Sequence, residues 1–102
     1  MTENISIGQW EKYEGDDWWS WAVWIEGSPA ELATIECVEW RLHPTFPKPI
    51  RKVFDRESKF RLETAGWGGF KIVAYVGRKE SERIKLVHEL ELHYPSGKAT
   101  TA

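Results

Sequence analysis

The sequence has a single cysteine, Cys37, so the chain cannot form an intramolecular disulfide bond. Its start lacks the apolar segment of a secretion signal, and no apolar run approaches the roughly 20 residues that a bilayer span requires. Glu, Lys or Arg interrupts every hydrophobic segment. These absences predict a soluble protein with no membrane partner. We expect it inside the cell, in the cytoplasm of a prokaryote or the nucleus of a eukaryote.

An excess of charge of one sign is also lacking. The chain carries 14 basic and 16 acidic residues, a formal net charge of −2, and both signs are spread fairly evenly along it. Binding to a phosphate backbone depends on a concentration of Lys and Arg. The sequence therefore predicts no nucleic-acid partner.

The residues that ligate metals are few and poorly spaced. His88 and His93 are five positions apart, so they would face opposite sides of a strand. Neither His43 nor Cys37 stands at a spacing that places three ligands on one element. We expect no metal site.

Catalytic motifs are missing as well. The glycines of residues 65–69 are followed by a strand pattern, whereas a phosphate-binding loop needs the N-terminus of a helix. The paired acids Asp16 and Asp17 lie in a turn, where solvated carboxylates are expected. The sequence therefore predicts no enzymatic activity and no cofactor.

Aromatic residues are abundant by contrast, with seven tryptophans among 102 residues, a length that suits one hydrophobic core. Turn-forming clusters recur every 8 to 15 residues or so, and apolar residues alternate between them. The alternating residues are Trp19, Trp21, Val23, Ile25, Val38, Trp40, Leu42, Phe60, Leu62, Phe70, Ile72, Ala74 and Val76. This pattern predicts short strands that each bury one face.

The segment from Ile84 to Tyr94 admits two interpretations. Ile84, Val87 and Leu90 have a helical spacing, whereas Leu86, Leu90, Leu92 and Tyr94 share one period-two register, which we interpret as a strand. The chain is then an all-β protein, an antiparallel β-sandwich of about seven to eight strands in two sheets. We expect residues 5–94 to form this domain and residues 95–102, which have little to bury, to form a disordered tail.

Two loops carry the most informative residues. In the first, prolines at positions 44, 47 and 49 surround His43, Thr45 and Phe46 and stiffen the chain, so that Phe46 is held in one orientation. In the second, Gly66 and Gly68 flank Trp67, which has no place in the alternation of the next strand. Glycine lets the backbone approach a ligand closely. Together the loops offer two aromatic plates, a hydroxyl and a free amide donor.

These two loops resemble the signature of the YEATS domain family. The matching residues are Leu42-His43-Pro44-Thr45-Phe46-Pro47, Pro49, Arg51, Phe60, Glu63 and Gly66-Trp67-Gly68-Gly69-Phe70. The stretch Trp21–Gly27 is similar to the first core strand of that family, and His88–Leu92 to its last. The short chain looks more like a prokaryotic relative than a eukaryotic histone reader.

The resemblance implies an immunoglobulin-like sandwich whose end loops hold an acetyl-, crotonyl- or similar acyl-lysine of a peptide or protein tail. It makes Phe46 and Trp67 the two plates that enclose the acyl group. The Thr45 hydroxyl would bond the ligand amide, and the backbone N–H of Trp67 its carbonyl. The other implied site residues are His43, which would orient Thr45, Gly66 and Gly68, which would keep the slot open, and Trp18, which would add a further aromatic ring.

Two other functions fit the same fold. The first alternative is a protein-interaction module that binds its partner independently of lysine acylation, in bacterial stress or immune signalling. A third interpretation is carbohydrate binding, because β-sandwiches with exposed tryptophans stack on sugar rings; it predicts tryptophans spread along one sheet face. For each site residue the simpler role also stands: core packing for Phe46 and Trp67, a turn cap for Thr45 and loop support for His43.

Overall fold

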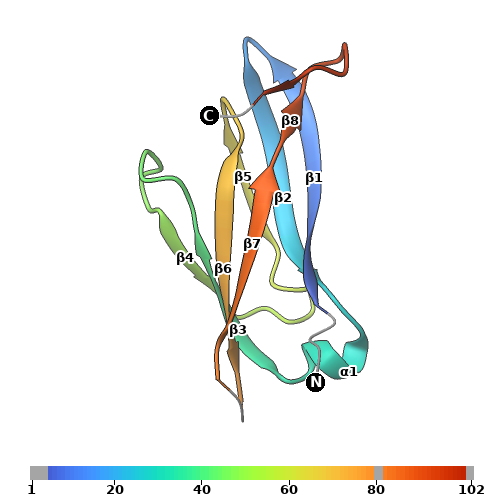
Figure 1. Cartoon of the computed structure of the whole chain (residues 1–102), viewed down its shortest axis with the longest axis vertical. Helices are drawn as coiled ribbons and strands as arrows, with labels where there is room; N and C mark the ends of the chain where they lie inside the picture. The colour runs from blue at the N-terminus through green and yellow to red at the C-terminus, as the bar shows by residue number, and fades with distance from the viewer. Residues whose placement is uncertain (1–4, 80–81, 101–102) are drawn as a thin grey trace.

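The fold is seen in a computed structural model that describes residues 5–79 and 82–100. A three-stranded antiparallel sheet, with the order β1-β2-β5, forms one layer (Figure 1). Its strands are β1 (Ser6–Gly15), β2 (Trp18–Glu26) and β5 (Leu62–Gly66). Because β2 lies in the middle and pairs on both sides, it contributes the most continuous buried face of this layer.

A four-stranded antiparallel sheet, with the order β4-β3-β6-β7, forms the second layer. Its strands are β3 (Ile35–Arg41), β4 (Ile50–Val53), β6 (Phe70–Arg78) and β7 (Ile84–Leu90). Residues from both sheets share one core. The predicted all-β sandwich is confirmed, and so is the assignment of the segment after Ile84 as a strand.

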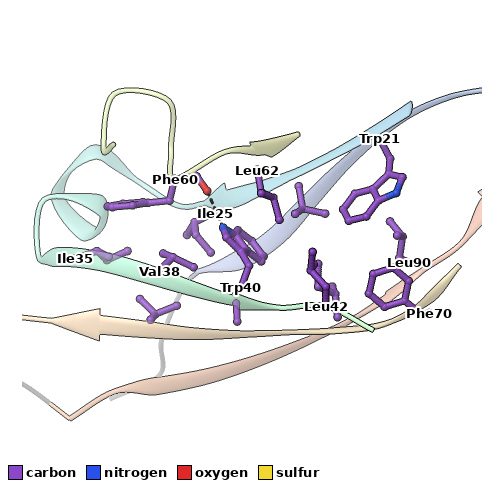
Figure 2. Packing of buried hydrophobic residues seen from close by; sticks show 14 of the residues in the cluster. Trp21, Ile25, Ile35, Val38, Trp40, Leu42, Phe60, Leu62, Phe70 and Leu90 are labelled. Carbon is purple, nitrogen blue, oxygen red and sulfur yellow. Dashed lines mark hydrogen bonds between the residues drawn. The ribbon is translucent and has the colours of Figure 1, made fainter. Parts of the chain in front are cut away.

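The core contains every residue that the alternation assigned to it, and also Leu32, Ile35, Leu90 and Leu92 (Figure 2). All four alternating residues of β2 are buried, from Trp19 to Ile25, and so are their counterparts on β3 and β6. Among the residues that alternate, the largest fully buried side chains are Trp19, Trp21, Trp40, Phe60, Ile25, Ile72, Val23, Val38 and Val76. Burial of such side chains is the main favourable term for a domain of this size.

One indole ties the two layers together. Trp40 of β3 is completely buried, and its Nε1–H donates to the carbonyl oxygen of Phe60 at 3.0 Å (Figure 2). Phe60 and the preceding Lys59 both have positive φ, at 58° and 61°, which is uncommon for residues other than glycine. The Lys59 carbonyl accepts a second bond, from the amide of Ile25 on β2. The corner before β5 is therefore held from both sheets.

A short helix, α1 (Pro29–Leu32), was not expected from the sequence. Ser28 and Glu31 form a capping box, in which the Ser28 hydroxyl accepts from the amide of Glu31 at 3.2 Å, and Pro29 occupies the first turn. Gly27, Ser28 and Pro29 form one of the recurring turn-forming clusters of the sequence, which predicted a turn here. At four residues the helix does not alter the fold class, and the described residues hold no helix of sufficient length and apolarity to cross a bilayer.

The predicted disordered tail is wrong for residues 95–100. Strand β8 (Leu92–His93) pairs with β9 (Ala99–Thr100) in a small hairpin, closed by bonds between Tyr94 and both Gly97 and Lys98. The hairpin has an anchor in Leu92, which is fully buried. Residues 101–102 lie outside the described residues.

A polar seam closes the side of the sandwich between β1 and β7. Gln9 donates through Nε2 to the Glu11 carboxylate at 2.7 Å and to the Glu91 carbonyl at 2.8 Å. Its Oε1 is left to face Nε2 of His88 at 2.8 Å, so this ring nitrogen carries the proton of the neutral imidazole. Desolvation by burial lowers the pKa of His88 below its ordinary value, against a smaller opposite effect of Glu89.

We predict that this histidine makes the fold sensitive to acid. Because its pKa is lower in the folded than in the unfolded chain, the stability it contributes is present above the unfolded pKa of about 6.5 and is lost as pH falls below that value. Thermal unfolding between pH 7.5 and 5.5 should show a steeper loss for the natural chain than for His88→Gln. The two proteins share all other titrating groups, so equal slopes would contradict the prediction.

Candidate ligand-binding site

Three connections meet at one end of the sandwich, opposite α1 (Figure 1). They are the β1–β2 turn, the β3–β4 loop of residues 42–49 and the β5–β6 loop of residues 67–69. Each of the residues that the sequence singled out belongs to one of these connections or to a strand end next to it.

The β1–β2 turn presents an indole. Asp16 and Asp17 are the two central residues, with φ of 55° and 56°, the geometry of a type I′ hairpin turn, which tolerates Asp. The turn residues are exposed, as the sequence predicted. Trp18 follows immediately and is 45% exposed, whereas its neighbour Trp19 is fully buried. The turn thus places Trp18 at the end of the sandwich and outside the core.

The β3–β4 loop holds a hydroxyl in a defined position. The backbone N–H of Thr45 donates to Nδ1 of His43 at 3.3 Å, and the Thr45 hydroxyl lies 2.9 Å from the same nitrogen. Because Nδ1 accepts the backbone bond, the proton of the neutral ring is on Nε2, and the hydroxyl donates to Nδ1 as well. The Thr45 oxygen keeps its lone pairs for another partner.

The ring of Phe46 stands at the boundary between this loop and the core. It contacts Phe70 at a centroid distance of 5.5 Å and meets Trp21 edge to face at 6.2 Å. The guanidinium of Arg51 lies 6.0 Å from its centroid. Phe46 is partly buried, so neighbouring aromatic rings fix its orientation while part of it stays accessible.

The β5–β6 loop presents the second indole. The β5–β2 register ends at Gly66, which pairs with Trp19, so Trp67 lies beyond the ladder. Trp67 is 57% exposed, which agrees with its lack of place in the alternation. A Cβ on Gly66 would lie 3.5 Å from Cζ of Phe46 and 3.6 Å from Nε1 of Trp21, so the bare backbone leaves space beside the Phe46 ring.

A cavity of about 160 Å³ lies among these loops, and all seven candidate residues from the sequence line it. Its full lining is Trp18, His43, Thr45, Phe46, Pro47, Ala65, Gly66, Trp67, Gly68 and Phe70. The sequence pattern indicated neither Pro47 nor Ala65 as lining residues, although they adjoin Phe46 and Gly66, and it assigned Phe70 to the core alone. Two signals in the sequence could have indicated these lining residues. Pro47 and Ala65 are adjacent in the chain to predicted site residues, and Phe70 begins the strand that follows the second loop. That the rings of Phe46 and Trp67 enclose an acyl group stays a prediction.

The lining is mainly apolar and contains four aromatic rings, and the one ionisable side chain among its described residues is that of His43. Within the described part of the chain no carboxylate belongs to the lining, so these residues offer no counter-charge to a cation. Its polar groups are a hydroxyl that can accept a hydrogen bond and the backbone around Trp67. This arrangement suits a flat, neutral group with an amide, held between ring faces.

Comparisons with known proteins agree with the loop signature. The family model of the prokaryotic YEATS domain matches residues 19–91. The chain is 32% identical over 78 residues to the AF-9 homolog of Eremothecium gossypii and 31% identical to that of Saccharomyces cerevisiae. These matches cover 72% of this chain and 36% and 34% of the relatives, so the chain spans about a third of their length.

Solved structures of YEATS domains have the same architecture. The Yaf9 YEATS domain bound to H3K27ac superposes with a TM-score of 0.75 at 25% identity, over 94% of this chain and 76% of that one. The Yaf9 YEATS domain recognizing an H3K122suc peptide gives a TM-score of 0.73 at 28% identity, over 87% and 71%. With an immunoglobulin-like sandwich, the signature loops at one end and a family match across most of its length, this chain belongs to the YEATS domain family.

Proposed function

We propose that the chain is a non-enzymatic module that binds an acylated lysine of a peptide or protein in the cavity between its end loops. The observation that carries the proposal is the convergence of Trp18, Phe46 and Trp67, from three separate connections, on one cavity that also contains the Thr45 hydroxyl. Similarity to a YEATS domain bound to H3K27ac and to one recognizing H3K122suc supports it.

Each part of an acyl-lysine has a partner in this site. The acyl group lies between the rings of Phe46 and Trp67. Its amide N–H donates to the Thr45 oxygen, whose own proton is engaged by His43. Its carbonyl accepts from the backbone amide of Trp67, which stands beyond the β5–β2 register. Gly66 keeps the backbone close to the ligand without filling the slot.

Unmodified lysine is rejected on electrostatic grounds. Its ammonium group would lose hydration in the slot and gain no carboxylate, because there is none among the lining residues that the structure describes. Acylation removes the charge and adds a planar amide, so the same side chain becomes a good match for the ring faces. The site therefore discriminates acylated from unmodified lysine through the desolvation cost of the ammonium group.

The affinity is expected to be weak. Stacking adds about 0.5–1.5 kcal/mol beyond area burial, and two hydrogen bonds contribute about 1 kcal/mol each. Burial of about 100 Å² of apolar ligand surface adds about 2.5 kcal/mol. Together these contributions correspond to a dissociation constant on the order of 100 μM, and because association itself costs several kcal/mol, we expect values above about 100 μM.

The acyl chain preferred by this site is planar and unsaturated. Two ring faces reward a flat π-system along its length, so crotonyl-lysine should bind more tightly than acetyl-lysine. Titration of the labelled chain with otherwise identical crotonyl-, acetyl- and unmodified lysine peptides tests both statements. If the three peptides bind equally, the acylation-independent interaction module is the better account.

Replacement of Thr45 by valine tests the hydroxyl directly. Valine conserves the volume but cannot accept the ligand N–H, so the buried amide is left without a partner at a cost of about 1–3 kcal/mol. Crotonyl-lysine should bind about 5- to 150-fold more weakly, while Thr45→Ser, which keeps the hydroxyl, retains most of the affinity. Equal losses in both variants would assign Thr45 a role in loop packing instead.

A further inference from the structure

The outer face of the four-stranded sheet gathers charges that are far apart in the sequence. In antiparallel pairing, directly opposed residues share a face. The register therefore places Lys52, Glu39, Tyr75 and Lys85 in one row across β4, β3, β6 and β7. A neighbouring row contains Ile50, Arg41, Val73 and Val87. Both rows point away from the core.

Two arginines flank the aromatic ring in the first row. The guanidinium carbons of Arg41 and Arg83 lie 4.9 Å and 4.6 Å from the centroid of Tyr75. Arg41 also forms an ion pair with Glu39 at 2.6 Å, and Glu39 is buried beneath this contact. The Tyr75 ring thus holds two cations in fixed positions at the centre of the sheet.

The face is basic on a molecule that is acidic elsewhere. On the paired strands its cations are Arg41, Lys52, Lys71 and Lys85, and its carboxylates are Glu39 and Glu89, so four positive and two negative charges leave +2. The whole chain has a formal charge of −2, so the remainder carries −4. Such asymmetry orients an acidic partner toward this sheet.

We propose that this outer face is a docking surface for an extended acidic segment of a partner protein. Lys52 and Lys85 stand on the two edge strands, three strand spacings or about 14 Å apart. In an extended peptide, residues four apart point the same way and are about 13 Å apart. A segment that crosses the strands therefore places two acidic side chains on the two lysines and the intervening side chain midway, between the positions of Glu39 and Tyr75 on the two central strands.

The mixture of apolar and basic residues favours a peptide over a nucleic acid. Ile50 and Val87 are about half exposed and lie in the row beside the lysines. An acidic segment with apolar side chains matches both rows, whereas a phosphate backbone has nothing to place on the apolar one. The surface is separate from the end-loop cavity, so the two sites can be tested independently.

A synthetic peptide with glutamates four residues apart and a leucine midway provides the test. We expect it to bind the full chain with an affinity that falls as salt is raised, and to shift amide resonances of β6 and β7 in NMR titrations. Lys52→Glu and Lys85→Glu should each weaken binding about tenfold. The double reversal should bind the matching peptide that carries lysines in place of the glutamates.

Lys12→Glu is the matched control, because Lys12 is an exposed lysine on the outer face of the other sheet. It should leave peptide binding unchanged, and all three variants should keep their unfolding temperature. The proposal is overturned if a glutamine version of the peptide binds equally well, or if Lys12→Glu weakens binding as much as the other reversals. Tighter binding of a DNA duplex than of the peptide would also overturn it.

Discussion

Replacement of Trp67 by alanine is expected to abolish measurable binding of acyl-lysine while leaving the fold intact. The indole is 57% exposed and lies outside the core, so its removal costs the domain little. In the proposed complex it forms one of two stacking faces. Loss of such an aromatic contact costs about 1–3 kcal/mol, or about 5- to 150-fold in affinity, and binding is weak from the start.

Trp10 offers a matched control for this experiment. It is 46% exposed and lies on the outer face of the three-stranded sheet, away from the cavity. Isothermal titration with crotonyl-lysine peptide should show unchanged affinity for Trp10→Ala and partial affinity for Trp67→Phe, which keeps a ring. If Trp67→Ala binds as tightly as the natural chain, the aromatic-slot mechanism is wrong.

The second large effect concerns stability. Replacement of the buried Trp40 by alanine should lower the free energy of unfolding by about 3–5 kcal/mol, because it leaves a cavity where the two sheets meet. It also leaves the Phe60 carbonyl without its 3.0 Å hydrogen bond from the indole. In a small domain with about 5–15 kcal/mol in total, this is a large fraction of the stability.

Denaturant titration of a short series separates these two contributions. Trp40→Phe restores much of the volume but not the hydrogen bond, so it should fall between the natural chain and Trp40→Ala. The half-exposed Trp10 again provides the control, with a change near zero expected for Trp10→Ala. An equal loss for Trp10→Ala and Trp40→Ala would show that Trp40 does not hold the layers together.

Carbohydrate binding draws some support from tryptophans on one sheet face, since Trp10 and Trp24 both lie on the outer face of β1-β2-β5. The Trp24 indole, however, lies against Gly8 and is covered by Arg61, whose guanidinium is 5.0 Å from its ring. Its Nε1–H is engaged by Glu26. Because this ring already has partners on the sheet, the end-loop cavity is the stronger candidate site.

Departures from the sequence prediction have two different origins. Helix α1 depends on a local signal, the Ser28-to-Glu31 capping box, which was available but was interpreted as a turn. The hairpin of residues 95–100 depends on a partner, because β9 exists only by pairing with β8 and β8 is anchored by Leu92 in the core. The helix could therefore have been predicted from the sequence, whereas the hairpin depends on contacts that form only in the folded chain.

The sequence by itself determined most of the strands, their inward faces and the chemistry of the two loops. Alternation depends only on which side of a strand each residue points, and every such residue from Trp19 to Ile25 is buried. Loop chemistry is equally local, since prolines around Phe46 and glycines around Trp67 act on their own backbone. These features required no knowledge of which strands are neighbours.

Only the tertiary structure decided what those local features form together. Sheet packing brings Trp18 to the same cavity as Phe46 and Trp67, and strand order places Lys52 and Lys85 on one basic face although charge is spread evenly along the chain. The physical reason is that burial of apolar side chains is non-directional. An inward-facing Val or Ile is buried equally well beside any strand. The alternating pattern therefore specifies which face of a strand is buried but not which strand lies next to it.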